Sequence, residues 1–119
     1  MRKKNIKNKR YACNEFRFNY THGHMNYIFE EDGKKYHSLG LTHHQFTKDK
    51  NKKWRKNMPL TKNPEKGDNQ PSYIRYGVIS DKKNNYYHKP SGKFTFTSED
   101  LSRVKSKIRN YKNRRKKRK

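Results

Sequence analysis

The chain has 119 residues, enough for one small domain, and its 33 Lys and Arg residues against 10 Asp and Glu residues give a net charge of +23. Six of the basic residues lie in residues 1–10 and seven in residues 112–119, so residues 11–111 still hold 20 basic residues against 10 acidic ones. This balance predicts a polyanionic partner, while the single cysteine excludes an internal disulfide and the lack of a long apolar run excludes a membrane-spanning helix.

We expect three parts along the chain: a basic flexible arm at residues 1–10, a single small α+β domain at residues 11–111, and a basic tail at residues 112–119. Ile, Val, Leu and Phe together make up only 17 residues, which limits the size of the core. The nine Tyr, six Phe and one Trp add apolar area, and they favour a folded body over a fully disordered chain.

Residues 11–20 alternate in part between apolar and polar side chains, which predicts a short strand. Residues 24–41 then predict the central β-hairpin of an antiparallel sheet of three to five strands. Asp32-Gly33 suits a two-residue type I′ turn, because both central positions of that turn need φ > 0. Counted outward from this turn, the register places four residues on one face: Met25, Tyr27, Phe29 and Tyr36. The other face then carries His24, Ile28, His37, Leu39 and Leu41.

The same register gathers histidines at the open end of the hairpin. It places His22 opposite His43, with His24 on the same face. Histidine titrates near neutral pH and so suits the two proton transfers of RNA cleavage, while Lys and Arg suit the phosphate. We therefore predict a candidate catalytic group: His22, His24, His43, Arg75 and Tyr73. Near this group we also expect His44, Lys62 and Ser72.

Two other interpretations of the histidines stay open. Three imidazoles on a sheet can hold Zn²⁺ with an open fourth position, but no carboxylate is placed to orient or complete such a site. The histidines can also be surface or half-buried hydrogen-bonding residues that touch phosphates without a catalytic role. We predict no metal and no cofactor.

A second basic segment follows the hairpin, with eight Lys or Arg residues between Lys48 and Lys66 in a Lys- and Asn-rich loop. Trp54 lies in its middle, and it serves either as a packing anchor or as a stacking platform for an unpaired base. Residues 61–72 are rich in turn signals. The residues expected to contact nucleic acid are Lys52, Lys53, Trp54, Arg55, Lys56, Lys62, Arg75, Arg103, Lys107, Arg114 and Arg115.

Residues 73–80 predict the next strand, and residues 93–96 can add a short one. One face of the first carries Ile74, Tyr76 and Val78. A C-terminal helix is predicted next, with Thr97 as its cap and Asp100 three residues on to complete a capping-box-like pair. Its apolar stripe consists of Leu101, Val104, Ile108 and Tyr111. The predicted fold class is therefore α+β, with a small antiparallel sheet followed by one helix.

The pattern YHSLGLTHH, followed by PLTKNPEKGDNQPSYIR and a basic helix, resembles small basic proteins from mobile elements of low-GC Gram-positive bacteria. The resemblance covers residues 22–111 and rests on Gly40, Leu41, Thr42, His43, Pro59, Leu60, Asn63, Pro64, Ser72, Tyr73 and Arg75. The small sheet plus helix is also similar to compact ribonuclease toxins of the barnase and RelE type. The helix comes last here, unlike in those toxins, so the resemblance implies no role for a particular residue.

The sequence therefore predicts a nucleic-acid-binding protein, with RNA favoured over DNA because aromatic residues interleave with cations and suit stacking on unpaired bases. These aromatics are Tyr27, Tyr36, Trp54, Tyr73, Tyr76, Tyr86 and Tyr87. The alternative is a metal-independent endoribonuclease of the mobile-element toxin or processing type. A third hypothesis is a structural or inhibitory component of a ribonucleoprotein machine. We expect a cytoplasmic location and no membrane partner, and the further candidate partners are a cognate inhibitor or a larger ribonucleoprotein.

Overall fold

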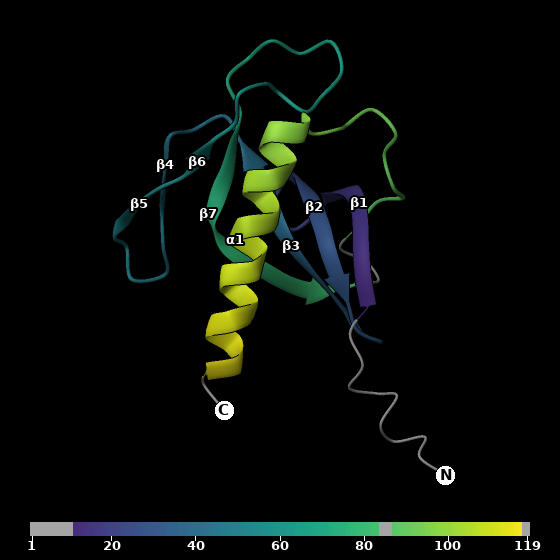
Figure 1. Ribbon diagram of the computed structural model, residues 1–119, viewed down its shortest axis with the longest axis vertical. Coiled ribbons are helices and arrows are strands. Elements are labelled where there is room, and N and C mark those ends of the chain that lie inside the picture. The colour runs from purple at the N-terminus through teal and green to yellow at the C-terminus, as the bar shows by residue number, and fades with distance from the viewer. Residues whose placement is uncertain (1–10, 84–86, 118–119) are drawn as a thin grey trace.

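The computed structural model describes residues 11–83 and 87–117, so the arm predicted at residues 1–10 lies outside the described residues. Within those ranges the fold is α+β, as predicted, with an antiparallel sheet followed by one C-terminal helix (Figure 1). The strands are β1 (Tyr11–Asn19), β2 (His24–Glu31), β3 (Lys35–Thr42), β4 (Phe46–Lys48), β5 (Trp54–Lys56), β6 (Met58–Pro59) and β7 (Tyr73–Lys82). The helix is α1 (Ser98–Lys117).

The main sheet has the strand order β1-β2-β3-β7-β6, and each neighbouring pair in it is antiparallel. Helix α1 runs along one face of this sheet (Figure 1). The β4–β5 hairpin forms a small sheet of its own and projects to one side, away from β1. The segment predicted as a Lys- and Asn-rich loop therefore contains two short paired strands, in which Thr47 pairs with Arg55.

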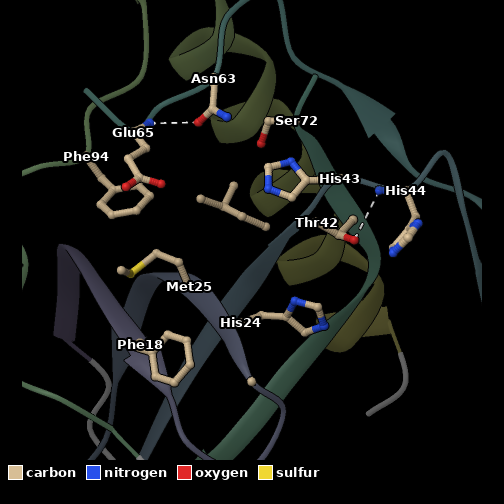
Figure 2. Close-up of a pocket in the computed structure, with 12 residues that line it drawn as sticks. Phe18, His24, Met25, Thr42, His43, His44, Asn63, Glu65, Ser72 and Phe94 are labelled. Atoms are coloured by element: carbon tan, nitrogen blue, oxygen red, sulfur yellow. Dashed lines mark hydrogen bonds between the residues drawn. The ribbon is translucent and has the colours of Figure 1, made fainter. Parts of the chain in front are cut away.

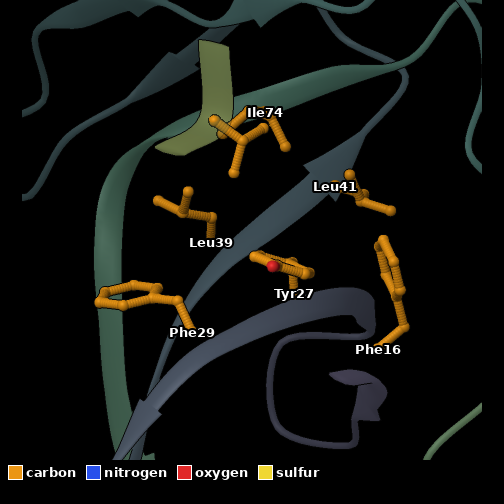
Figure 3. Packing of buried hydrophobic residues seen from close by; sticks show 7 residues of the cluster. Phe16, Tyr27, Phe29, Leu39, Leu41 and Ile74 are labelled. Carbon is orange, nitrogen blue, oxygen red and sulfur yellow. The ribbon is translucent and has the colours of Figure 1, made fainter. Parts of the chain in front are cut away.

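The hydrophobic core lies between the sheet and the helix (Figure 3). Its buried members are Phe16, Tyr27, Phe29, Leu39, Leu41, Ile74 and Val104. Three of the four residues predicted for the apolar stripe of the helix belong to the core region: Val104 is fully buried, and Ile108 and Tyr111 pack against the cluster. The fourth, Leu101, is half-buried and lines a pocket with Phe96. Since the core is small, each of these apolar side chains, worth about 1.5–3 kcal/mol when fully buried, is a large share of the stability.

The start of the helix is capped as predicted, because the Asp100 amide donates to Thr97 Oγ1 over 3.1 Å. The Asp100 carboxylate does not complete a capping box but binds a residue outside the helix. It is fully buried and accepts hydrogen bonds from the Thr61 amide at 3.0 Å and from the Thr61 hydroxyl at 3.0 Å. Asp100 thus ties the loop after β6 to the first turn of α1.

The helix also runs through the boundary predicted at residue 112, because it ends at Lys117. The Glu30 carboxylate of β2 is 4% exposed and pairs with Arg115 at 3.1 Å and with Lys112 at 3.8 Å. These ion pairs offset part of the repulsion among the basic side chains of the last turns. The segment predicted as a basic tail is therefore largely a continuation of the helix.

The turn between β2 and β3 differs from the predicted type I′ turn. Asp32 and Gly33 are not among the described residues with positive φ, so the conformation that this turn requires is absent there. Instead, Asp32 Oδ1 accepts hydrogen bonds from the amides of Lys34 at 2.9 Å and Lys35 at 2.8 Å. An Asp side chain that bonds amides further along the chain makes a turn without left-handed residues.

This turn changes the register and corrects the predicted faces. Tyr27 pairs with Leu39, and a bulge between Ile28 and Glu30 absorbs the extra residue. Since a one-residue slip moves every side chain of a strand to the other face, Leu39 joins Tyr27 in the core rather than lying opposite it. The bulge also turns two successive side chains, Phe29 and Glu30, toward α1.

Two further predictions need correction. Residues 93–96 form no strand, and Phe94 makes only an isolated bridge to Glu65. In β7, Ile74 and Val78 pack in the core as predicted, but Tyr76 is 48% exposed. The register shifts within this stretch of β7, so Tyr76 is released from the core face.

The Asp32 turn predicts a loss of stability in acid. Burial alone would raise the pKa of Asp32, but the Lys34 and Lys35 amides and the His37 ring outweigh it and lower the pKa to about 2 from 3.8. The charged carboxylate therefore contributes about 2 kcal/mol above pH 4, and this contribution disappears as the pH falls toward 2. Asp32→Asn should lower the free energy of unfolding at pH 7 by about 2 kcal/mol. The free energy of unfolding of this variant should also fall less between pH 4 and pH 2 than that of the wild type.

Urea unfolding at pH 7, 4 and 2 measures the effect, with the exposed Glu99→Gln as the matched control. An Asp32→Asn protein that keeps the full decline in acid would contradict the role of this turn.

Candidate histidine cavity and cation–aromatic surface

A cavity of about 420 Å³ opens at the end of β2 and β3 that lies away from the Asp32 turn (Figure 2). Its polar lining consists of His24, Thr42, His43, His44, Asn63, Glu65 and Ser72. Its apolar lining consists of Phe18, Met25, Leu41 and Phe94. The polar side chains come from three places: β2, the residues around the end of β3, and the loop that leads into β7. We call this site the histidine cavity.

The tautomer of His43 follows from its hydrogen bond. His43 Nδ1 lies 2.8 Å from the carbonyl oxygen of Pro71. A carbonyl oxygen only accepts, so Nδ1 carries the proton. Nε2 is therefore the atom of His43 that can take up and release a proton, and the bond to Pro71 orients the ring.

His24 is half-buried and lies in a positively charged environment. Burial lowers the pKa of His24, and the positive charge of Arg75 lowers it further, followed by the charges of His22, His44 and His43. These charges act on the His24 ring in a register that differs from the predicted one.

Arg75 reaches its place because Gly40 has no side chain. A Cβ atom at position 40 would lie only 3.0 Å from Arg75 Cδ. The aliphatic part of Arg75 therefore lies beside Gly40 of β3, on the strand next to β2.

Three residues of the predicted catalytic group do not line the cavity: His22, Tyr73 and Arg75. The His22 ring is bound to Asp81 Oδ2 at 3.0 Å, and its amide donates to Asn19 Oδ1 at 3.0 Å. Tyr73 is half-buried and pairs with Thr42 and Pro59 in the sheet. In their place the fold brings Asn63 and Glu65 to the cavity, and only the turn signals around Pro64 hinted that this loop folds back.

A metal centre finds no support in the geometry. Within residues 11–83 and 87–117, no three His, Cys, Asp or Glu side chains are grouped so that they could hold a metal ion. The histidine cavity is lined by one carboxylate, that of Glu65. Its polar groups are therefore better suited to proton transfer and anion binding than to metal ligation.

A second feature lies on the β4–β5 hairpin, β7 and α1. Trp54 is 65% exposed, and Lys48 Nζ lies 5.1 Å from the centre of its ring. Phe46 is 49% exposed and forms an apolar patch with Trp54. The Trp54 ring is thus not the packing anchor of the loop but an open aromatic face beside a cation.

Tyr76 is the second exposed aromatic of this region. Two cations lie at its ring: the Arg55 guanidinium carbon is 5.3 Å and Lys107 Nζ is 5.8 Å from the ring centre. Lys107 Nζ also donates to the Tyr76 carbonyl at 3.1 Å. We call the six residues Lys48, Trp54, Arg55, Tyr76, Lys107 and Arg114 the cation–aromatic surface. It has two parts, because Trp54 and Lys48 lie on one face of the β4–β5 hairpin, while Arg55 lies on the other face with Tyr76, Lys107 and Arg114.

Lys107 and Arg114 line a hollow of about 330 Å³ beside Tyr76, and no carboxylate lines it. Burial lowers the pKa of Lys107, and the charge of Arg114 lowers it further. In the described part of the chain, neither cation forms an ion pair with an acidic side chain. Two neighbouring cations without a carboxylate form a site that an anion would stabilise.

The other predicted nucleic-acid contacts fall into two groups. Three arginines are engaged by carboxylates: Arg55 by Asp49 at 2.8 Å, Arg103 by Asp100 at 3.3 Å, and Arg115 by Glu30 at 3.1 Å. Four lysines are exposed: Lys52, Lys53, Lys56 and Lys62. Arg75 is not part of this surface: its side chain lies beside Gly40, and its charge lowers the pKa of His24.

Some of the aromatics predicted for stacking are in the wrong place. Tyr27 is 4% exposed and belongs to the core. The Tyr87 hydroxyl is buried, and the ring of Tyr36 packs edge-on against Tyr87 at 5.0 Å. Tyr86 lies outside the described residues. Among the described members of the predicted set, Trp54 and Tyr76 are exposed beside cations, while Tyr36 is half-buried with Arg17 and Lys83 at its ring.

The environment of His24 predicts how its titration responds to mutation. Arg75→Gln removes a positive charge that lowers the pKa of His24, so the pKa should rise while the burial effect stays. NMR titration of the histidine ring protons measures this shift. Arg17→Gln is the matched control, because Arg17 lies over the Tyr36 ring and pairs with Glu15. An unchanged His24 pKa in Arg75→Gln would show that Arg75 does not act on this ring.

Comparisons with known proteins do not identify a relative. No family model, no curated protein and no solved structure matches the chain. Among the described residues, no helix is long and apolar enough to cross a membrane. The function is therefore inferred from the geometry of the cavity and of the cation–aromatic surface.

Proposed function

We propose that the protein binds nucleic acid, with single-stranded RNA favoured over duplex DNA, through the cation–aromatic surface. The observation that carries this proposal is the exposure of two aromatic rings, Trp54 and Tyr76, each with cations at its ring. Stacking on an unpaired base is worth about 1–3 kcal/mol per ring, while cations beside the ring neutralise the phosphates.

The cations at these rings are held weakly enough to yield to a ligand. A cation–π contact at an exposed site is worth about 0.5–1 kcal/mol, less than the stacking of a base. Lys48 and Lys107 can therefore move from the ring to a phosphate when a base stacks. The Trp54 ring, at 65% exposure, offers the larger open area of the two.

Single strands are favoured because their bases are open to stacking, whereas the bases of a duplex already stack on one another. The net charge of +23 adds a general attraction to any nucleic acid, and this part of the affinity depends strongly on salt. Aromatic stacking is the part of the affinity that separates single strands from duplexes.

Trp54→Ala and Tyr76→Ala should each weaken binding of a random-sequence single-stranded RNA by about tenfold, because each removes one stacking ring. Neither should change the slope of log affinity against log salt. Lys107→Gln should instead lower that slope by about 1, as expected for the loss of one phosphate contact. Fluorescence anisotropy at several salt concentrations measures both quantities.

Tyr20→Ala is the control, because Tyr20 is 54% exposed but packs on His88 rather than on the cation–aromatic surface. Equal loss in Tyr20→Ala and Trp54→Ala would argue for non-specific attraction. Duplex DNA bound as tightly as single-stranded RNA would overturn the proposed preference. Strong selection of one RNA from the random pool would favour a component of a particular ribonucleoprotein.

A further inference from the structure

We infer that the histidine cavity cleaves the RNA that the cation–aromatic surface binds, without a metal, with His24 and His43 moving protons and Arg75 stabilising the phosphate. This inference rests on the proposed RNA binding and adds a reaction to it. It revises the catalytic group predicted from the sequence: His22 and Tyr73 are left out, and Arg75, which does not line the cavity itself, is kept because its charge acts on His24.

The cavity and the surface are joined by one buried side chain. Asn57 is 2% exposed, and its Nδ2 donates to the His44 carbonyl at 3.0 Å and to Thr47 Oγ1 at 2.8 Å. Asn57 Oδ1 accepts from the Tyr76 amide at 2.8 Å. The rim of the cavity, the β4–β5 hairpin and the Tyr76 strand are therefore fixed to one another. An RNA strand that stacks on Tyr76 therefore lies on β7, and the backbone of β7 is linked through Asn57 to the His44 carbonyl at the rim of the cavity.

The charges around the cavity suit a phosphodiester. Positive charge reaches His24 from β7 through Arg75, from the β1–β2 turn through His22, and from the residues after β3 through His43 and His44. The negative groups nearby are Glu65, which lines the cavity, and Asp81, which already binds His22. A phosphate would relieve the mutual repulsion of the cations, and it would add charge where Arg75 can stabilise it.

The two histidines differ in the way that acid–base catalysis requires. Burial and the charge of Arg75 lower the pKa of His24, which favours the neutral ring that can accept a proton. His43 Nδ1 is held by the Pro71 carbonyl, so Nε2 is its exchanging atom. The protonated ring can donate from Nε2 to a leaving oxygen while the bond to Pro71 keeps it oriented.

The reaction balances with these groups alone. His24 takes the proton of the ribose 2′-hydroxyl, and the 2′-oxygen forms a bond to the adjacent phosphorus. The bond between phosphorus and the 5′-oxygen breaks, and His43 Nε2 gives its proton to that oxygen. The products are a 2′,3′-cyclic phosphate and a 5′-hydroxyl end, and Arg75 stabilises the charge on the five-coordinate phosphorus. Proton exchange with water restores both rings.

The test uses the full chain with a random-sequence, end-labelled single-stranded RNA in EDTA. Wild type should cut it and leave 2′,3′-cyclic phosphate ends. His24→Gln and His43→Gln should each slow cleavage by about 100-fold or more but keep RNA affinity. Circular dichroism checks that the variants fold, and Arg75→Lys, which keeps the charge but loses the planar fork, should also slow cleavage.

Two histidines serve as controls. His88→Gln should cut like wild type, because His88 lies outside the cavity and contacts Tyr20 Oη. His22→Gln should keep substantial cleavage, because its ring is bound to Asp81 and not directed to the substrate. The pH profile of wild type should be bell-shaped, and the limb at low pH should vanish in His24→Gln, where no base titrates.

The outcomes separate the inference from the proposed function. RNA that is bound but stays intact overturns the cleavage inference and leaves RNA binding standing. RNA that is neither bound nor cut overturns both. Cleavage that EDTA abolishes overturns the metal-free reaction, and cleavage that persists in His24→Gln and His43→Gln overturns the assignment of the residues. If Trp54→Ala loses both RNA binding and cleavage, the defect lies in the cation–aromatic surface and not in the histidine cavity.

Discussion

The register between β2 and β3 decides which side chains build the core and which build the cavity. With Tyr27 paired to Leu39, the apolar residues of both strands meet α1, and Gly40 lies beside the Arg75 side chain. A register shifted by one residue would send Leu39 to the other face and separate the core from the helix. The carboxylate of Asp32 and the bulge after Ile28 together fix this register, so the fold and the candidate site depend on the same turn.

Buried polar side chains supplement the small hydrophobic core. Asp100 joins the loop after β6 to α1, Asn57 joins the β4–β5 hairpin to β7, and Glu30 joins β2 to the last turns of α1. Each is nearly fully buried, so removing any of their partners would leave a costly unsatisfied group. The Asn57 contacts also position the two candidate features. A chain with few aliphatic residues can thus still hold the histidine cavity and the cation–aromatic surface in a fixed relation.

The sequence predicted the helix, its cap and its apolar stripe well, because these follow from local spacing at positions such as Thr97 and Val104. It predicted the hairpin but not the register, since Asp32-Gly33 is compatible with both a type I′ turn and a turn closed by the Asp side chain. The histidines were still expected in the right neighbourhood, because a slip of one residue moves His24 and His43 little along the strands. Glu65 and Asn57 were not predictable, because their places depend on contacts between segments distant in the sequence.

Gly40 shows how a site can constrain a residue that touches no ligand. Its φ is not in the left-handed region, so nothing in the backbone requires a glycine there. A Cβ atom there would instead crowd the Arg75 stem on the neighbouring strand, which would have to shift by a few tenths of an ångström. The effect of a substitution at position 40 therefore depends on the space that the Arg75 side chain needs, not on the backbone conformation. The narrow range of residues expected at position 40 is a consequence of Arg75. A protein without this arginine could carry a residue other than glycine there.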